Sequence, residues 1–192
     1  MKIIHSIQEL RSEIKKFKIS EKKIGFVPTM GALHECHLSL ARFCAQFHEL
    51  TVISIFVNPA QFGKGEDFDK YPRTLSKDAE MLASIETESG KSFIIFAPEV
   101  SEMYPSVGGL TISMPELTSR LCGASRPGHF DGVALVVSKL FHIVEPDVAY
   151  FGQKDYQQTL VIKRLVSALN FPVEIQVLPT LRETDGLAMS SR

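Results

Sequence analysis

Residues 24–37 read Ile24-Gly25-Phe26-Val27-Pro28-Thr29-Met30-Gly31-Ala32-Leu33-His34-Glu35-Cys36-His37. The first four predict a short buried strand, and we expect Pro28 to end it because proline has no N–H for a sheet ladder. Apolar residues then recur at helical spacing, so a helix follows the strand directly. Its buried stripe is expected to contain Leu40, Ala41, Cys44 and Phe47.

The alternation of apolar strand and helix continues along the chain in both directions. Ser6 and Glu9 form a capping box that predicts the start of the first helix. Residues 110–114 alternate apolar and polar side chains, which predicts one half-exposed strand. Further strands are expected at 51–57, 93–96, 148–151 and 173–177, and further helices at 75–90, 133–144 and 155–169. Continuous apolar strands separated by helices are typical of an α/β fold, so we expect a Rossmann-like, mainly parallel sheet with helices on both faces.

The composition is that of an ordinary globular chain. Of 192 residues, 44% are hydrophobic and 22% are charged, and 21 Lys and Arg against 22 Asp and Glu leave a net charge of −1. This balance argues against a nucleic-acid binder, which is normally basic. No apolar run reaches the about 18 residues of a membrane span, and the first residues lack the apolar core of a signal peptide. The three cysteines lack C-x-x-C spacing, so we expect a reducing, cytoplasmic setting without disulfides.

His34 and His37 lie where the first predicted strand passes into a helix. Such a junction presents unpaired backbone N–H groups and the positive end of a helix dipole, which suits a phosphate. Residues three apart face the same side of a helix, and each imidazole can donate a hydrogen bond to a phosphate oxygen. Two surface histidines are the plain alternative. Because both stand close to Gly31 at a strand end, we favour a phosphate site; a zinc-protease motif would need a histidine in place of Leu38.

Longer strings of this sequence resemble a known family. The His-x-x-His start resembles the nucleotide-binding signature of the HIGH superfamily, which includes class I aminoacyl-tRNA synthetases and small nucleotidyltransferases. The string at 28–37 is narrower, and it is similar to the pantothenate synthetase (pantoate–β-alanine ligase) family. Matching strings follow in the family's order at 56–63, 71–74, 126–133, 146–158 and 182–192. Together they extend over most of the chain, which is identified as a member of that family.

Three departures from the family pattern bear on function. Cys36 replaces the family's glycine between the two motif histidines, so we expect the added side chain to weaken ATP binding. Leu181 stands where valine is common. The resemblance also implies that residues 1–192 form the Rossmann-like ATP- and pantoate-binding domain, with the family's smaller C-terminal domain absent from this chain. We therefore expect a truncated form with reduced activity.

The resemblance implies an ATP-dependent ligase that joins (R)-pantoate to β-alanine. Pantoate attacks the α-phosphate of ATP, giving a pantoyl adenylate and pyrophosphate, and the amine of β-alanine then displaces AMP to give pantothenate. The protein would act by positioning and by stabilising phosphate charge. Two alternatives stay open: a nucleotidyltransferase that makes a dinucleotide with the same histidines, and a domain that binds these ligands but turns over poorly.

The resemblance also assigns roles to single residues. His34 and His37 would contact phosphates, with His37 as the proton donor, and Lys154 would add a cation near the α-phosphate. Gln61 and Gln158 would bind pantoate, and Gln61 would also meet β-alanine. The implied ATP site comprises Met30, Gly31, Ala32, Leu33, His34, Glu35, Cys36, His37, Gly152, Gln153, Lys154, Asp155, Leu181, Met189, Ser190, Ser191 and Arg192. The plain alternatives are a solvated lysine, surface glutamines, a helix N-cap for Asp155 and a solvated chain end.

ATP as a substrate implies Mg²⁺ to neutralise phosphate charge, but the sequence names no protein ligand for it. Asp78 lies near the region that the family uses, yet most helical aspartates are simply solvated. The resemblance further implies small-molecule partners, no nucleic acid or membrane, and a homodimer. The weaker site candidates, which can equally hold loops or cap a helix, are Asn58, Arg126, His129 and Asp131.

Overall fold

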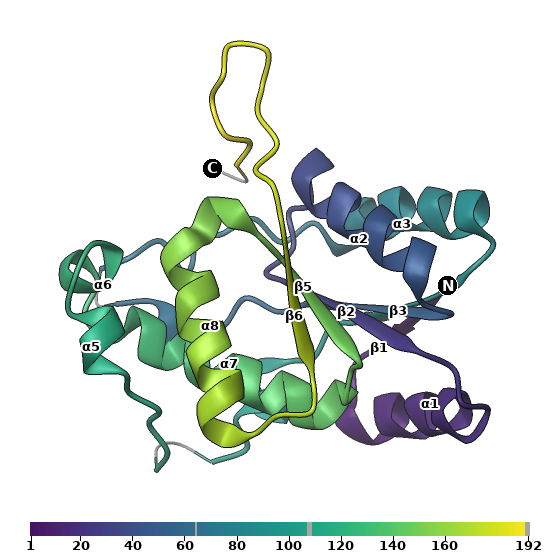
Figure 1. Ribbon diagram of the computed structural model, residues 1–192, viewed down its shortest axis with the longest axis horizontal. Helices are drawn as coiled ribbons and strands as arrows, with labels where there is room; N and C mark the ends of the chain where they lie inside the picture. The colour runs from purple at the N-terminus through teal and green to yellow at the C-terminus, as the bar shows by residue number, and fades with distance from the viewer. Residues whose placement is uncertain (64, 107–108, 191–192) are drawn as a thin grey trace.

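The structure is a computed structural model that describes residues 1–63, 65–106 and 109–190. Within these residues, six parallel strands form one sheet in the order β1-β4-β3-β2-β5-β6, with helices on both faces (Figure 1). This confirms the predicted Rossmann-like α/β fold. The strands are β1 (Lys2–Ile4), β2 (Ile24–Thr29), β3 (Leu50–Ile55), β4 (Ser92–Phe96), β5 (Val148–Gly152) and β6 (Glu174–Leu178). The sequence does not predict β1, because three residues are too few to show a period.

The longer helices form two layers. α1 (Ile7–Ile19), α7 (His129–Val144) and α8 (Tyr156–Leu169) pack against one face of the sheet, and α2 (Glu35–Phe47) and α3 (Leu75–Ser89) against the other (Figure 1). The connections contain α4 (Val100–Met103), α5 (Pro115–Thr118), α6 (Cys122–Ser125), η1 (Pro59–Gln61) and η2 (Gln153–Asp155). The Ser6 side chain accepts the Glu9 N–H at the start of α1, as predicted. No helix in the described part of the chain is long and apolar enough to span a bilayer.

Pro28 does not end β2, which continues to Thr29. β2 pairs with β3 along its whole length but with β5 only at Gly25 and Phe26. Pro28 therefore lies beyond the last pair with β5, on the side where its missing N–H removes no ladder bond. The strand order also reverses here, since β3 and β4 lie on one side of β2 and β5 and β6 on the other. Such a switch point is where parallel α/β sheets bind ligands.

Two other predictions of local structure are wrong. Phe47 is 61% exposed, because α2 ends at this residue and its ring lies beside Phe43 instead of the sheet. Residues 110–114 form no strand, although Ile112 and Met114 pack against the core. Alternating polarity therefore marks a half-buried extended segment here, and a neighbouring strand is also needed to make a sheet.

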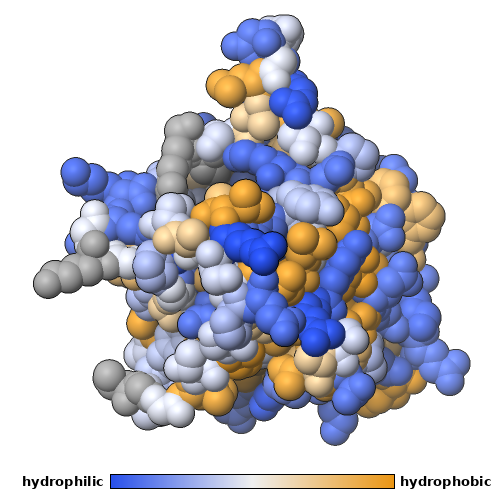
Figure 2. Space-filling model, turned by 60° about the vertical axis from the view of Figure 1, so that its left-hand side comes forward, coloured by the Kyte–Doolittle hydropathy of each residue, from blue (hydrophilic) through white to orange (hydrophobic). Residues whose placement is uncertain are grey.

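Residues 179–190 leave β6 and project from the body of the molecule as an irregular hairpin (Figure 1). A single bridge between Arg182 and Ala188 closes the hairpin, and Leu187 near its tip is 68% exposed. The space-filling view shows this segment standing clear of the body, with hydrophobic and hydrophilic residues interspersed on the face in view (Figure 2). Its far end returns to the body, where Ser190 reaches the cleft described next.

Candidate functional site

A cleft of about 300 Å³ lies at the carboxyl ends of β2, β3 and β5. Its apolar lining comes largely from α7, through Val133, Val136, Val137 and Leu140. Segments far apart in the sequence supply the polar lining, which includes His34, His37, Asn58, Gln61, Arg126, His129, Lys154, Asp155, Gln158 and Ser190. The cleft thus brings both predicted glutamines together with the histidine pair and the predicted lysine.

A buried carboxylate holds the turn from β2 into α2. Asp78 on α3 is fully buried, and its Oδ2 accepts the N–H of Ala32 at 3.0 Å. Its Oδ1 accepts the N–H of Leu33 at 2.9 Å and the hydroxyl of Thr74 at 3.1 Å. Gly31 and Ala32 have φ angles of 82° and 49°, a left-handed backbone that costs an alanine about 1–2 kcal/mol. The expectation that Asp78 is solvated is therefore wrong, and its carboxylate offsets the strain of this turn.

His34 and His37 occupy the first turn of α2, with ring centroids 4.2 Å apart. The backbone N–H of His34 donates to Nδ1 of His37 at 3.4 Å, which leaves the proton of the neutral His37 ring on Nε2. Burial, and then the nearby His34 and Lys154, lower the pKa of His37 to about 4. Burial and Lys154 also lower the pKa of His34. Both rings therefore face the cleft as neutral hydrogen-bond donors near pH 7.

This lowered pKa of His37 predicts a loss of stability in weakly acidic solution. As the pH falls below the ordinary value of 6.5, the unfolded chain takes up the proton before the folded chain, whose pKa is about 4. Stability should be complete above pH 6.5 and should decline toward pH 4, by at most about 1.4 kcal/mol per pH unit for this group. His34 and His129, whose pKa values are also lowered, add to the decline.

Urea unfolding at pH 7, 6 and 5 measures this decline. The variant His37→Gln should reduce the slope, whereas His142→Gln, at an exposed position on α7, should leave it unchanged. An unaltered slope in His37→Gln would contradict the assignment of the shifted pKa to His37.

A second strand-to-helix junction, between β5 and α8, completes the polar side of the cleft. Lys154 and Asp155 in η2 are exposed and line the cleft, as does Gln158 in the first turn of α8. Asp155 is the N-cap residue of α8, as the plain alternative has it, but its side chain makes no capping hydrogen bond to the helix. Gly152 and Gln153 form the turn itself and do not line the cleft.

The remaining predicted ATP residues fall into three groups. Glu35 is exposed and forms an ion pair with Arg42, and Leu33 is buried in the core between α2 and the sheet. Met189 donates its N–H to the carbonyl of Leu181 at 3.2 Å within the projecting hairpin. Three residues, Gly31, Ala32 and Cys36, belong to the β2–α2 turn and the start of α2 and do not line the cleft, whereas Met30 does. Ser191 and Arg192 lie outside the described residues.

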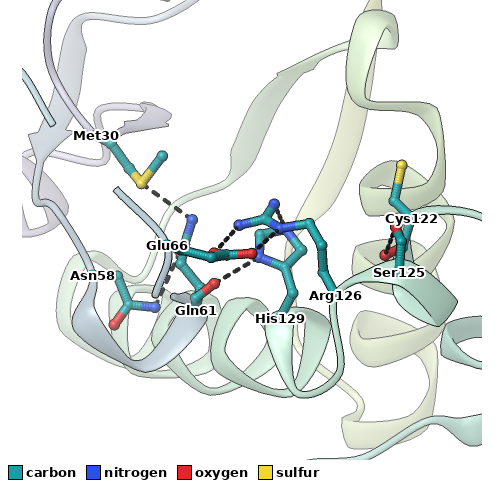
Figure 3. Close-up of polar contacts among 8 residues, drawn as sticks. All are labelled: Met30, Asn58, Gln61, Glu66, Cys122, Ser125, Arg126 and His129. Atoms are coloured by element: carbon teal, nitrogen blue, oxygen red, sulfur yellow. Dashed lines mark hydrogen bonds and ion pairs between the residues drawn. The ribbon is translucent and has the colours of Figure 1, made fainter. Parts of the chain in front are cut away.

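Gln61 lies in η1, just after β3, and is 8% exposed. Figure 3 shows its polar contacts. Its Oε1 accepts a hydrogen bond from Nδ2 of Asn58 at 3.1 Å, and its Nε2 donates to Sδ of Met30 at 3.1 Å. Its backbone carbonyl accepts from Nδ1 of His129 at 2.8 Å. Arg126 donates to the other ring nitrogen of His129 at 3.1 Å. Since an arginine only donates, His129 must carry its proton on Nδ1, and the carbonyl of Gln61 is held by a true donor.

Arg126 is itself oriented by Glu66 through two hydrogen bonds of 2.7 and 2.6 Å (Figure 3). This bidentate pairing lowers the pKa of Glu66 to about 2. Nothing in the sequence pattern singles out Glu66, and Arg126 and His129 are only weak candidates there. Their positions inside or beside the strings at 56–63 and 126–133 are the one signal that connects them.

Gly132 on α7 lies directly against η1. A Cβ at this position would lie 2.1 Å from the carbonyl oxygen of Ala60 and 2.6 Å from the nitrogen of Gln61. No side chain fits there, so the sequence places glycine where the helix and the segment carrying Gln61 meet backbone to backbone.

The described residues do not fit a resident metal ion. Among them, no three His, Cys, Asp or Glu side chains gather in a way that could hold one. Both oxygens of Asp78 accept hydrogen bonds from the protein, so this residue is not open to Mg²⁺.

Comparison with known proteins gives concordant results. The sequence pattern of the family described as Pantoate-beta-alanine ligase matches residues 2–192. Pantothenate synthetase from Moorella thermoacetica is 54% identical over 192 residues, covering 100% of this chain and 66% of that protein. The chain therefore spans about two thirds of the length of such curated relatives.

Two solved structures agree with this match. The pantoate-beta-alanine ligase (pantothenate synthetase) of Thermus thermophilus has a TM-score of 0.90 at 47% identity, covering 100% of this chain and 66% of that chain. The pantoate-beta-alanine ligase of Francisella tularensis, complexed with beta-gamma ATP and beta-alanine, has a TM-score of 0.93 at 41% identity, covering 100% and 71%.

Proposed function

Because the chain belongs to the pantoate-beta-alanine ligase family, we propose that its cleft binds ATP and pantoate for the ligation of pantoate to β-alanine. The observation that carries the proposal is the convergence of two kinds of group at one switch point. His34, His37 and Lys154 suit the phosphates of a nucleotide, and Gln61 and Gln158 suit the hydroxyls and carboxylate of a small acid.

In the proposed first step, a carboxylate oxygen of pantoate attacks the α-phosphorus of ATP and the bond to pyrophosphate breaks. Negative charge builds on the phosphate oxygens, where the ammonium group of Lys154 and the Nε2–H of His37 would stabilise it. Mg²⁺ would enter as part of the substrate, bound to ATP. The product of this step is pantoyl adenylate.

In the proposed second step, the amine of β-alanine attacks the acyl carbon of the adenylate. The carbon–oxygen bond to AMP breaks, the attacking nitrogen loses a proton, and pantothenate leaves. The histidines are neutral near pH 7 and hold their hydrogens toward the phosphate side, so we assign them to stabilising AMP as the leaving group.

Pantoate-dependent exchange of pyrophosphate into ATP tests the first step in this chain. We expect exchange with pantoate present and none without it. Exchange without pantoate would favour the dinucleotide-forming alternative. Binding of both ligands by calorimetry without any exchange would favour a domain that binds but turns over poorly.

Gln158→Ala should weaken pantoate binding far more than ATP binding. A polar partner left unpaired in a cleft costs about 1–3 kcal/mol, or roughly 5- to 150-fold in Kd, whereas the ATP Kd should stay within about twofold. Separate calorimetric titrations measure both, with Gln46→Ala on the exposed side of α2 as the matched control. Equal losses for the two ligands would mean that Gln158 shapes the cleft generally.

Cys36 should be a thiol whose reactivity responds to ATP. It is half-buried in the first turn of α2, whereas Cys44 is fully buried and burial raises the pKa of its thiol to about 12. Iodoacetamide should therefore modify Cys36 faster than Cys44, and ATP should slow only the reaction at Cys36; the exposed Cys122 is the internal control. Although Cys36 does not line the cleft, the family's glycine at this position predicts that Cys36→Gly binds ATP more tightly. A reaction at Cys36 that is indifferent to ATP would show that its side chain points away from the nucleotide.

The homodimer and the reduced activity of a chain of this length are further proposals that rest on family membership. Sedimentation of this chain tests the first. Turnover beside a version carrying the C-terminal domain of a relative tests the second.

A further inference from the structure

We infer that Tyr104 is a positioning residue: through Asn58 it holds the amide of Gln61 with its NH₂ group toward the cleft, so that Gln61 acts on its ligand as a hydrogen-bond donor. The identity of that ligand rests on the proposed function, but the orientation of the amide does not.

Asn58 is 1% exposed, and its side-chain amide is held on both sides. Its Oδ1 accepts the backbone N–H of Ala60 at 3.2 Å, a group that can only donate. Its Nδ2 donates to the backbone carbonyl of Gly132 at 3.1 Å, a group that can only accept. Turning the amide round would place donor against donor and acceptor against acceptor, so Asn58 has one possible orientation.

Tyr104 provides a further constraint on the Oδ1 atom of Asn58. Its hydroxyl donates to Oδ1 of Asn58 at 2.7 Å. Burial raises the pKa of Tyr104 to about 12, so the hydroxyl keeps its hydrogen at neutral pH. The ring packs beside Phe56 with centroids 6.2 Å apart, and Tyr104 does not itself line the cleft. Any effect of the Tyr104 hydroxyl on a ligand therefore passes through Asn58.

The orientation of Asn58 decides that of Gln61. The Nδ2 of Asn58 can only donate, so the atom of Gln61 that it meets at 3.1 Å must be the oxygen (Figure 3). The Nε2 of Gln61 is thereby turned to the opposite side, toward Sδ of Met30, which lines the cleft. The main chain of Gln61 is held independently by His129, so the whole residue is fixed before any ligand arrives.

A donor in this position selects oxygen acceptors. The carboxylate and hydroxyl oxygens of a small hydroxy acid qualify, whereas an ammonium group offers only hydrogens. The family resemblance assigns Gln61 to both pantoate and β-alanine, and an amide can both donate and accept. The geometry narrows this assignment: Gln61 meets pantoate through an oxygen, and it meets β-alanine through the carboxylate end and not the amine.

The orientation can be tested without any ligand. In ¹⁵N-resolved NMR spectra of this chain, the side-chain NH₂ protons of Gln61 should show a nuclear Overhauser contact to the S-methyl group of Met30. Asn58→Asp replaces the donor by an oxygen, so the Gln61 amide should turn round and the contact should disappear. Absence of the contact in the parent chain, or its persistence in a folded Asn58→Asp variant, would overturn the proposed orientation.

Tyr104→Phe keeps the ring, removes the hydroxyl and disturbs folding least. We expect the pantoate Kd to rise about fivefold while the ATP Kd stays within about twofold. Tyr150→Phe is the matched control, because it removes a tyrosine hydroxyl that lies 3.4 Å from Nδ1 of His48 and outside the cleft, and it should change neither Kd. An unchanged pantoate Kd, or equal losses for both ligands, would overturn the role of Tyr104. A parent chain that binds no pantoate would instead contradict the proposed function, and the NMR contact would still decide the orientation.

Discussion

Asp78→Ala is expected to lower the free energy of unfolding by about 3–5 kcal/mol and to abolish ATP binding. The change leaves the N–H groups of Ala32 and Leu33 without their acceptor, and an unpaired buried donor costs about 1–3 kcal/mol. It also removes the interactions that offset the left-handed backbone of Gly31 and Ala32. The turn should then relax, and the histidines that follow it should lose their common direction.

Urea unfolding and ATP calorimetry measure both effects of this change. Glu80→Ala, at an exposed position on the same helix, is the control and should change neither the free energy of unfolding nor ATP binding appreciably. Asp78→Asn should fall between the parent and the alanine variant, because it keeps one acceptor oxygen. A loss below about 1 kcal/mol in Asp78→Ala would show that the turn is held by something other than this carboxylate.

His37→Ala is expected to slow pantoate-dependent pyrophosphate exchange by about 10²–10³-fold, or about 3–4 kcal/mol of barrier. The variant loses an Nε2–H donor that would face the phosphate charge, and its ring makes one long hydrogen bond, of 3.4 Å, to the chain. Folding at pH 7.5 should therefore change little.

The control for this variant is His142→Ala, at an exposed position on α7, which should exchange like the parent. The unfolding curves of the two variants should nearly coincide at pH 7.5. A rate for His37→Ala within threefold of the parent would remove His37 from the proposed chemistry.

The sequence predicts the central strands and a phosphate site at the end of the first of them, because both depend on short-range patterns, but it does not show the strand order that creates the switch point. Apolar runs mark the four central strands, and the strings at 28–37 and 146–158 mark the two junctions that face the cleft. The error at Pro28 arises because a sequence does not show which neighbour a strand loses first. The error at 110–114 has the same cause, because an alternating apolar and polar pattern does not show whether a neighbouring strand is present to pair with.

The missing parts of the site depend on contacts between distant residues. Tyr104 lies 46 positions from Asn58, and Glu66 lies 60 positions from Arg126, so no spacing along the chain joins them. The role of Asp78 likewise depends on a distant segment, because a helical aspartate is solvated or buried according to which turn packs over it. Residue types and family strings therefore find the groups that would meet the ligand, but not the groups that hold them in place.

The close approach of Gly132 to η1 also bears on the order of events in binding. With no side chain between them, α7 and the segment carrying Gln61 pack backbone to backbone, so we expect the acid side of the cleft to lose few conformations on binding. The nucleotide side differs, because Ser190 reaches it from a hairpin joined to the body at its base. A small acid should therefore bind to a preformed site, at a rate set by diffusion and orientation. Association of the nucleotide should include a slower, concentration-independent phase while the hairpin settles, and stopped-flow traces with each ligand alone would separate the two behaviours.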